Sequence, residues 1–261
     1  MRDSVDRRSE LIVKYLLRAG TATVEELLLV VRSSESSIRR DLARLERKGL
    51  IRRSGGIAEL VDPLRYEPYC YNGAFVAREQ CFAAEKRRIG TAAAELVQSG
   101  ETVGLTAGTT TTYIGRNLRH RDKLQVVTNA INIGMELCSQ PGIRTFLTGG
   151  VIPSAESFSL SGNMALSFLG DVYTDKVFLS VTGLDAERGA TTLETDEALV
   201  FRKMLRHTKQ LIVAADSSKL GKVSPAFICQ LSEVHLLITD TGATDETVAP
   251  FERQGVRVIR A

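Results

Sequence analysis

Residues 36–53 read SSIRRDLARLERKGLIRR, a basic amphipathic stretch that leads directly into a second, shorter basic stretch. Within it, Ile38, Leu42 and Leu45 recur at the spacing of one face of a helix. The arginines and the lysine fall mostly around the rest of the cylinder. The pattern therefore predicts a helix that buries its aliphatic face and presents its cations to solvent.

Two helices are expected before this one. Apolar residues between Val5 and Leu17 give the first helix one apolar side, and Gly20 tolerates the left-handed turn that ends it. Thr23 and Glu26 have the spacing of a capping box for a second helix over residues 24–31. Three successive short helices of this kind predict a helix-turn-helix unit.

A two-stranded wing is expected after the basic helix, because apolar residues flank Arg52-Arg53-Ser54-Gly55-Gly56. A helix-turn-helix followed by a wing is typical of readers of duplex DNA, whose third helix enters a major groove about 12 Å wide. We expect Ser36, Ser37 and Arg40 at base edges and the other cations on phosphates. The candidate DNA-binding residues are Ser34 (which also caps the helix), Ser36, Ser37, Arg39, Arg40, Arg44, Lys48, Arg52, Arg53, Gly55 and Gly56.

A plainer interpretation of the basic helix is a solvated face, because Glu35, Asp41 and Glu46 are interleaved with its cations. The two preceding helices and the following wing favour DNA binding instead, since all of these elements come in the expected order and spacing.

The length of 261 residues permits two domains of unequal size. We expect a DNA-binding domain at residues 1–60, a linker at 61–83, which has two prolines and no sustained period, and a larger domain at 84–261. Residues 1–60 carry 13 Lys and Arg against 9 Asp and Glu, whereas the remainder carries 21 against 22. The positive end of the chain is therefore the end expected to meet phosphates.

The four cysteines form no CxxC pair and the three histidines lie far apart, so neither a disulfide framework nor a zinc site is indicated. No cofactor is expected. No segment approaches the roughly 18 to 20 apolar residues of a membrane span, and no secretory signal is visible. We expect a cytoplasmic, nucleoid-associated protein with no membrane partner.

In the larger domain, short apolar runs alternate with helical stretches. This alternation predicts a mostly parallel sheet covered on both faces, so the fold class is α/β. The predicted strands are 102–106, 124–128, 144–148, 176–182, 210–215, 234–239 and 256–259.

Polar residues or glycines follow most of these runs. The ligand crevice of such a sheet lies at the carboxyl ends of its strands. A glycine followed by hydroxyl residues at a helix N-terminus, as at 108–112, offers amides and a positive dipole to an anion such as a phosphate. The same residues could merely cap the helix, but four further polar strand ends, one with a lysine, favour an anionic ligand. The candidates are Gly108, Thr109, Thr110, Thr111, Thr112, Thr128, Asn129, Gly149, Gly150, Gly183, Asp216 and Lys219.

These motifs resemble the DeoR family of bacterial transcriptional regulators along the whole chain. The family's recognition helix, Ser-x-x-Thr-Ile-Arg-Arg-Asp-Leu, is similar to residues 34–42, and its wing is similar to residues 54–57. In the larger domain, its Glu-Lys-x-x-Ile motif is matched at Glu85, Lys86 and Ile89. Further matches are Gly-Thr-Thr-Thr at 108–111, Thr-Asn at 128–129, Gly-Gly at 149–150, Asp-Lys at 175–176 and Asp-Ser-Ser-Lys at 216–219.

The resemblance implies a winged helix-turn-helix joined to a sugar-phosphate sensor whose fold is similar to that of ribose-phosphate isomerase. It implies a repressor of a carbohydrate operon that is relieved by a phosphorylated sugar. It adds Glu197 as a candidate sugar-hydroxyl or structural contact. Thr106 stands where the family usually has Asp, and Phe201 stands where it often has Lys.

Two other functions remain open. Asp216, Lys219, Glu197 and Asp175 could supply acid and base groups to a sugar-phosphate isomerase or deaminase that carries a DNA-binding appendage. We expect no enzyme, because no acid/base pair has a spacing that demands catalysis and fold analogy does not establish activity. A scaffold that binds nucleic acid without sequence preference is disfavoured by the modest charge of the first 60 residues. Readers with two half-sites are symmetric, so a homodimer or homotetramer is expected.

Overall fold

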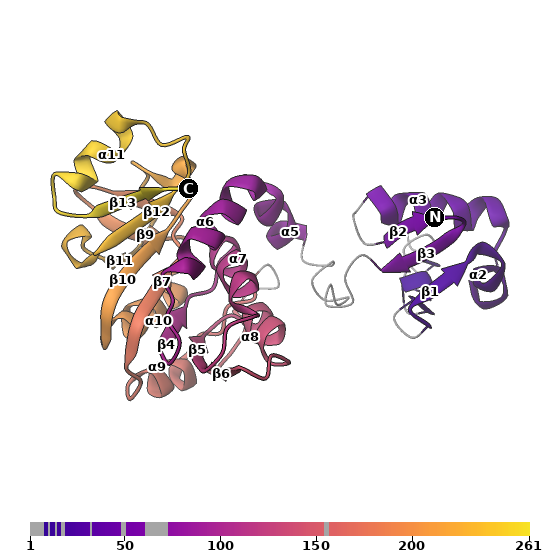
Figure 1. Cartoon of the computed structure of the whole chain (residues 1–261), viewed down its shortest axis with the longest axis horizontal. Helices are drawn as coiled ribbons and strands as arrows, with labels where there is room; N and C mark the ends of the chain where they lie inside the picture. The colour runs from indigo at the N-terminus through magenta and orange to yellow at the C-terminus, as the bar shows by residue number, and fades with distance from the viewer. Residues whose placement is uncertain are drawn as a thin grey trace. The chain divides into compact units, whose positions relative to one another are not determined.

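The computed structural model describes residues 8–9, 11–13, 15–16, 19–31, 33–47, 51–60, 73–153 and 157–261. The chain divides into two compact units, Met1–Asn72 and Gly73–Ala261, which are coloured indigo and purple to yellow in Figure 1. Each unit has its own hydrophobic core.

The first unit contains helices and a small sheet. Residues 11–13 and 15–16 are helical, and α2 (Val24–Val31) and α3 (Glu35–Arg47) follow. Ile38, Leu42 and Leu45 of α3 are at most 3% exposed and pack with Ile12 and Leu16. The predicted aliphatic face of the basic helix is therefore confirmed.

The predicted capping interactions are also confirmed. Thr23 and Glu26 exchange two hydrogen bonds: the backbone N–H of Thr23 donates to Glu26 Oε2 at 2.8 Å, and that of Glu26 donates to Thr23 Oγ1 at 3.2 Å. Ser34 precedes α3 and accepts a hydrogen bond at Oγ from the Ser37 backbone N–H at 3.4 Å. These contacts satisfy backbone donors that the first turn of a helix leaves unpaired.

The wing is a hairpin of β2 (Ile51–Ser54) and β3 (Ile57–Leu60), which pair antiparallel. Gly55 and Gly56 have φ angles of 58° and 84°, the left-handed conformation that a two-residue hairpin turn requires at both positions. A third strand, β1 (Thr21–Thr23), pairs with β3, which the sequence analysis missed because these residues were interpreted only as a helix cap.

The second unit is built around a seven-stranded parallel sheet in the order β13-β12-β10-β7-β4-β5-β6 (Figure 1). All seven predicted strands are present, with ends shifted by up to three residues. Their bounds are β4 (Thr102–Leu105), β5 (Leu124–Thr128), β6 (Ile143–Leu147), β7 (Thr174–Leu179), β10 (Thr208–Ala214), β12 (Leu236–Thr239) and β13 (Arg257–Arg260).

Helices cover both faces of this sheet. Helices α6 (Ala83–Glu95), α7 (Thr109–Leu118) and α8 (Ile131–Leu137) pack in sequence against one another, and α9 (Asn163–Leu169) packs against α10 (Thr195–Leu205). The connections through α7 and α8 run along the sheet in the opposite direction to those through α9 and α10. Right-handed crossovers then place the two groups on opposite faces.

A second, three-stranded antiparallel sheet was not predicted. It consists of β8 (Gly183–Asp185), β9 (Gly189–Thr192) and β11 (Ala226–Cys229). The last helix is α11 (Asp245–Glu252), and 3-10 turns cover Ser217–Lys219 and Leu231–Glu233. No helix in the described ranges combines the length and the apolar character that a membrane crossing requires.

Helix α5 (Gly73–Gln80) lies within residues 61–83, which the sequence predicts as a linker, and it belongs to the second unit. Phe75 is 4% exposed, and its ring meets the edge of Phe158 with centroids 4.9 Å apart. One buried aromatic does not create a repeated apolar spacing, so the sequence pattern did not reveal this helix. Residues 61–72 lie outside the described part of the chain.

Candidate nucleic-acid interface and ligand cavity

The start of α3 presents hydroxyl groups and cations together. Ser34 and Ser36 are exposed, and Ser34 Oγ lies 3.2 Å from Ser36 Oγ and 2.8 Å from Ser37 Oγ. Arg39 and Arg40 are exposed on the same helix, and Arg39 pairs with Glu35 at 2.6 Å. Exposed ion pairs of this kind contribute little to stability. Both guanidinium groups can therefore bind another molecule at little cost to the fold.

Two other candidate DNA-binding residues, Arg44 and Arg53, also make contacts within the domain. Arg44 Nη2 donates to Ser9 Oγ at 2.5 Å and lies 3.6 Å from Oδ1 of the buried Asp41. On the wing, Arg53 donates from Nε to Glu46 Oε2 at 2.8 Å and so ties β2 to α3.

Arg52, Gly55 and Gly56 of the wing are exposed to solvent. Lys48 lies outside the described residues, as does the predicted end of the helix at Gly49. Base and phosphate contacts at α3 and the wing stay predictions.

In the second unit, a cavity of about 290 Å³ lies where β4, β7 and β10 end. These three strands are neighbours at the centre of the sheet. The cavity is therefore at the carboxyl edge, where the sequence analysis placed the ligand crevice. Of the predicted ligand residues, the structure brings together Gly108, Thr109, Thr110, Glu197, Asp216 and Lys219 in its lining.

One wall is the loop from β4 into α7. Gly108 approaches Ser180 so closely that a Cβ at this position would lie 2.3 Å from Ser180 Oγ. Thr109 and Thr110, the first residues of α7, line the cavity, so the unpaired amides of this ten-residue helix begin at the cavity wall. This is a suitable place for an anionic group.

Charges of both signs line the cavity. The cations are Arg78, Lys86 and Lys219, and the carboxylates are Glu194, Glu197 and Asp216.

Lys86 is 4% exposed, and burial lowers the pKa of its ammonium group, although Asp216 acts in the opposite direction. Burial raises the pKa of Glu197, although a hydrogen bond from Thr192 Oγ1 to Glu197 Oε2, 2.8 Å long, acts against this shift. The cavity therefore holds ionisable groups that are poorly solvated, as is common at binding sites.

The remaining candidates lie outside the cavity lining and hold the surrounding loops. Thr111 and Thr112 donate from Oγ1 to the Gly108 carbonyl at 3.0 and 2.8 Å. Thr128 Oγ1 donates to the Leu105 carbonyl at 2.7 Å, and Asn129 Oδ1 accepts from the Ala107 backbone N–H at 2.9 Å.

Two of the predicted glycines are placed by close backbone approach, and a third by a left-handed backbone conformation. A Cβ on Gly150 would lie 2.2 Å from the Ser161 carbonyl oxygen, and one on Gly183 would lie 2.4 Å from that of Lys222. Gly149 has a φ of 68°. None of these three lines the described cavity.

Several lining residues were not predicted as ligand contacts. Arg78, Cys81, Phe82 and Lys86 come from α5, α6 and their connection, which precede the sheet in the chain. Lys86 stands three and seven residues before the buried Ile89 and Ala93, so its place on the inner face of α6 was the available signal. Further unpredicted lining residues are Ser157, Ser180, Val181, Thr182, Thr192, Leu193 and Glu194.

Thr106 and Phe201, the two departures from the family pattern, differ in their position relative to the cavity. Thr106 is fully buried, donating from Oγ1 to the Phe178 carbonyl at 3.4 Å and accepting from the Ser180 backbone N–H at 2.9 Å, and it does not line the cavity. Phe201 does line it and is 1% exposed. The cavity thus has an apolar side as well as a charged one.

Asp175, named for the enzymatic alternative, lies at the start of β7, at the opposite end of the sheet from the cavity. Its carboxylate accepts from the Thr102 backbone N–H at 2.9 Å and pairs with Lys209 at 2.7 Å. Within the described ranges, no cluster of three or more His, Cys, Asp or Glu could hold a metal ion.

Comparison with known proteins identifies the family of both domains. Residues 8–63 match the model of the DeoR-like helix-turn-helix domain, and residues 82–241 match that of the DeoR C terminal sensor domain. The chain belongs to the DeoR family. The HTH-type transcriptional repressor GlcR of Bacillus subtilis is 32% identical over 97% of this chain and 95% of its own. The HTH-type transcriptional regulator GolR of Listeria innocua is 31% identical over 96% of each.

A ribose 5-phosphate isomerase from Plasmodium falciparum matches 54% of this chain and 52% of its own, with 13% identity and a TM-score of 0.38.

Proposed function

We propose that this DeoR-family chain is a sequence-specific DNA-binding transcriptional regulator that represses a carbohydrate-metabolism operon. Its affinity for the operator responds to a phosphorylated sugar or similar anion in the cavity. The observation that carries the proposal is the presence, in one chain, of a basic helix with a wing and of a cavity that joins a helix N-terminus to cations, among them the buried Lys86. The relatives named as a repressor and a regulator support it.

The proposed DNA-binding domain is residues 1–60; the sensor begins at α5 (Gly73–Gln80) rather than at residue 84, which shortens the proposed linker to 61–72. Ser36, Ser37 and Arg40 read bases at the exposed start of α3. Arg39, Arg52, Arg53 and the wing glycines contact phosphates, together with Arg44 and Lys48. Such contacts release counterions, so affinity falls steeply with salt concentration.

In the sensor, the phosphate of the ligand binds the amides and hydroxyls of Gly108, Thr109 and Thr110, with Lys219 as a cation. Glu197 and Asp216 accept hydrogen bonds from sugar hydroxyls. The remaining predicted residues, Thr111, Thr112, Thr128, Asn129, Gly149, Gly150 and Gly183, shape the loops around the ligand. A volume of about 290 Å³ suits a small metabolite.

The protein acts as a homodimer or homotetramer on the chromosome in the cytoplasm, because two half-sites call for a symmetric assembly. An isomerase or deaminase is the competing function. It is disfavoured because Asp175 lies away from the three other groups that it would need. Turnover of ribose, glucosamine or tagatose phosphates by the purified protein would support it instead.

A binding assay tests the proposal. Fluorescence anisotropy of labelled fragments from around the gene should reveal one preferred fragment over shuffled DNA, and one sugar phosphate should change that affinity. Its unphosphorylated sugar should have no effect. Lys219→Gln should retain DNA binding and lose the response. Equal affinity for all fragments would rule out a sequence-specific regulator.

A further inference from the structure

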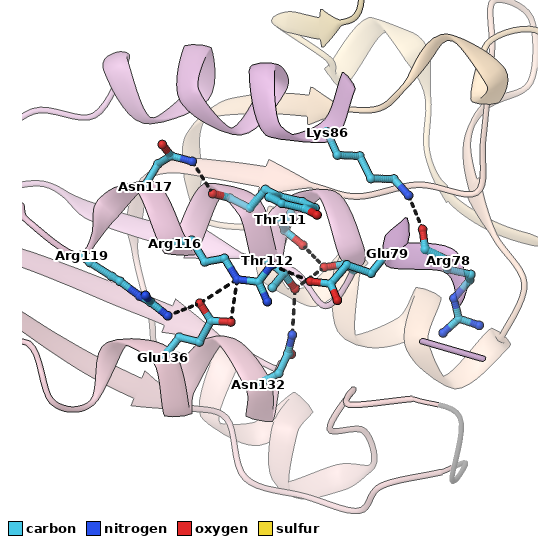
Figure 2. Close-up of polar contacts among 12 residues, drawn as sticks. Arg78, Glu79, Lys86, Thr111, Thr112, Arg116, Asn117, Arg119, Asn132 and Glu136 are labelled. Carbon is cyan, nitrogen blue, oxygen red and sulfur yellow. Dashed lines mark hydrogen bonds and ion pairs between the residues drawn. The ribbon is translucent and has the colours of Figure 1, made fainter. Parts of the chain in front are cut away.

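Helix α8 has the reverse of the usual surface polarity. Its one charged residue, Glu136, is 5% exposed and points toward α7, where it pairs with Arg116 and Arg119 (Figure 2). Met135 is 38% exposed, and Cys138, at the end of the helix, is exposed as well. A surface helix normally turns its charges to solvent and its apolar side chains to the core. The ion pairs of Glu136 therefore hold α8 with apolar atoms facing outward.

Exposed apolar side chains continue from α8 across the end of β6 to α9. Leu147, the last residue of β6, lies against α8, since a Cβ on Gly134 would be 2.8 Å from Leu147 Cδ2. Beyond β6, a Cβ on Gly149 would be 3.8 Å from Met164 Cε of α9. We define the β6 face as the exposed residues Met135, Cys138, Leu147, Val151, Ile152 and Met164.

The segment that forms this face is poor in charge. Residues 130–170 contain three charged residues, Glu136, Arg144 and Glu156, whereas the chain average of 25% over these 41 positions would give about ten. Depletion of charge, with methionine enriched, is typical of the core of a protein–protein interface. Monomeric proteins rarely expose large apolar patches. Both observations indicate that another protein surface covers the β6 face.

The two edges of the seven-stranded sheet differ in the same way. β13 forms one edge and exposes Arg257 and Arg260, and edge charges of this kind oppose association. β6 forms the other edge and ends in the exposed Leu147. An uncharged face can meet an identical face without opposing like charges, but it offers no cations to the phosphates of DNA. The occupant that suits it is a second copy of this chain.

We propose that the β6 face is the interface between two copies of this chain, which pack on each other about a two-fold axis. In such an interface the same surface of both copies takes part. The inference rests on the proposed function, because a regulator that reads two half-sites needs a symmetric assembly, and it adds the surface on which that assembly forms. None of the six residues lines the described cavity, so each copy keeps its own ligand site.

Sedimentation of the full chain, with pairs of charged variants, tests the interface. The wild type should be a dimer or a tetramer. One variant combines Val151→Lys with Met164→Lys, and the other combines Val151→Glu with Met164→Glu. Each brings like charges together and should raise the dissociation constant at least about a hundredfold. An equal mixture of the two variants should reassociate, because opposite charges then meet.

The fold of the single chain should survive these changes, since Val151 and Met164 are 65% and 70% exposed. Val223→Lys is the matched control, because Val223 is an exposed apolar residue outside the β6 face, and it should leave the assembly unchanged. Alkylation of Cys138 gives a second measurement. It should be slow in the wild type and fast in the lysine variant, with the exposed Cys81 as an internal reference.

Several outcomes would overturn the interface. A lysine variant that assembles as strongly as the wild type, or a mixture that does not reassociate, would show that the copies meet elsewhere. A monomeric wild type would also reject it, and slow alkylation of Cys138 in that monomer would show that another part of the chain covers the face. If the wild type is a tetramer, the lysine variant should stop at the dimer.

Failure of the proposed function would be seen separately. A wild type that prefers no DNA fragment in the anisotropy assay would reject the sequence-specific regulator, whereas sedimentation of the same protein would still decide whether the β6 face joins two copies. If the interface is correct and the function holds, the lysine variant should bind the preferred fragment more weakly, and adding the glutamate variant should restore that affinity.

Discussion

Gly108 and Ser180 lie in such close contact that no side chain fits between them: a Cβ on Gly108 would be 2.3 Å from Ser180 Oγ and 2.4 Å from Ser180 Cβ. The contact joins the loop after β4 to the residue after β7. It brings the first turn of α7 to the cavity wall, where both residues are part of the lining.

Gly108→Ala should therefore destabilise the protein by about 1–3 kcal/mol, the usual cost of overpacking, and should abolish phosphate binding. Thermal unfolding and a calorimetric titration measure the two effects. Ser180→Gly removes both clashing atoms, so the double variant should recover part of the lost stability. If Gly108→Ala binds phosphate as the wild type does, this wall is not the anion site.

Glu136 is the centre of a cluster that holds α7 to α8 (Figure 2). Its side chain is 7% exposed and accepts hydrogen bonds from Arg116 Nε at 2.9 Å and Arg119 Nη2 at 2.9 Å. Glu136→Gln leaves two guanidinium groups beside a neutral amide. We expect a loss of about 2–3 kcal/mol, below the roughly 3–5 kcal/mol of a fully buried pair, because both arginines keep about a quarter of their side-chain exposure.

Urea unfolding of Glu136→Gln and of Glu85→Gln as a control tests this expectation. Glu85 lies 3.8 Å from Arg88 in a partly exposed pair at the surface, which should contribute less than about 1 kcal/mol. Equal effects of the two substitutions would contradict a stabilising role for the cluster.

The sheet could be predicted because parallel strands, buried on both faces, produce uninterrupted apolar runs. Val177, Phe178 and Leu179 of β7 are all fully buried. Strands β8 and β9 have only three and four residues and begin with glycines, so they have no such run. The three-stranded sheet therefore depends on tertiary pairing that local pattern does not encode.

The site could be predicted only in part because strand order is not visible in the sequence. β5 and β6 lie beyond β4, away from β7 and β10. Asn129 after β5 therefore accepts a hydrogen bond from the Ala107 backbone N–H, whereas Asp216 after β10 lines the cavity. Lys86 comes from a helix before the sheet, and no strand-end rule could place it.

Glu197 should make stability depend on pH. Burial raises its pKa above the ordinary value of about 4.5, so the folded chain keeps this proton to a higher pH than the unfolded chain does. The proton's contribution to stability is present at low pH and is lost as pH rises through the folded pKa. Glu197→Gln does not titrate, so its melting temperature relative to the wild type should rise between about pH 4.5 and neutrality. Other titrating groups are shared and cancel in the difference, and a constant difference across this range would refute the assignment.

Arg40 and Arg44 allow DNA binding to be separated from folding on one helix. Arg40 is exposed, whereas Arg44 contacts Ser9 and Asp41 within the domain. Arg40→Ala should leave the melting temperature unchanged and weaken binding to the preferred fragment more than binding to shuffled DNA, because a base contact is lost. Arg44→Ala should lower the melting temperature of the first unit. If Arg40→Ala weakens both DNAs equally and lowers the salt slope by about one, Arg40 contacts a phosphate and the bases are read by other residues of α3.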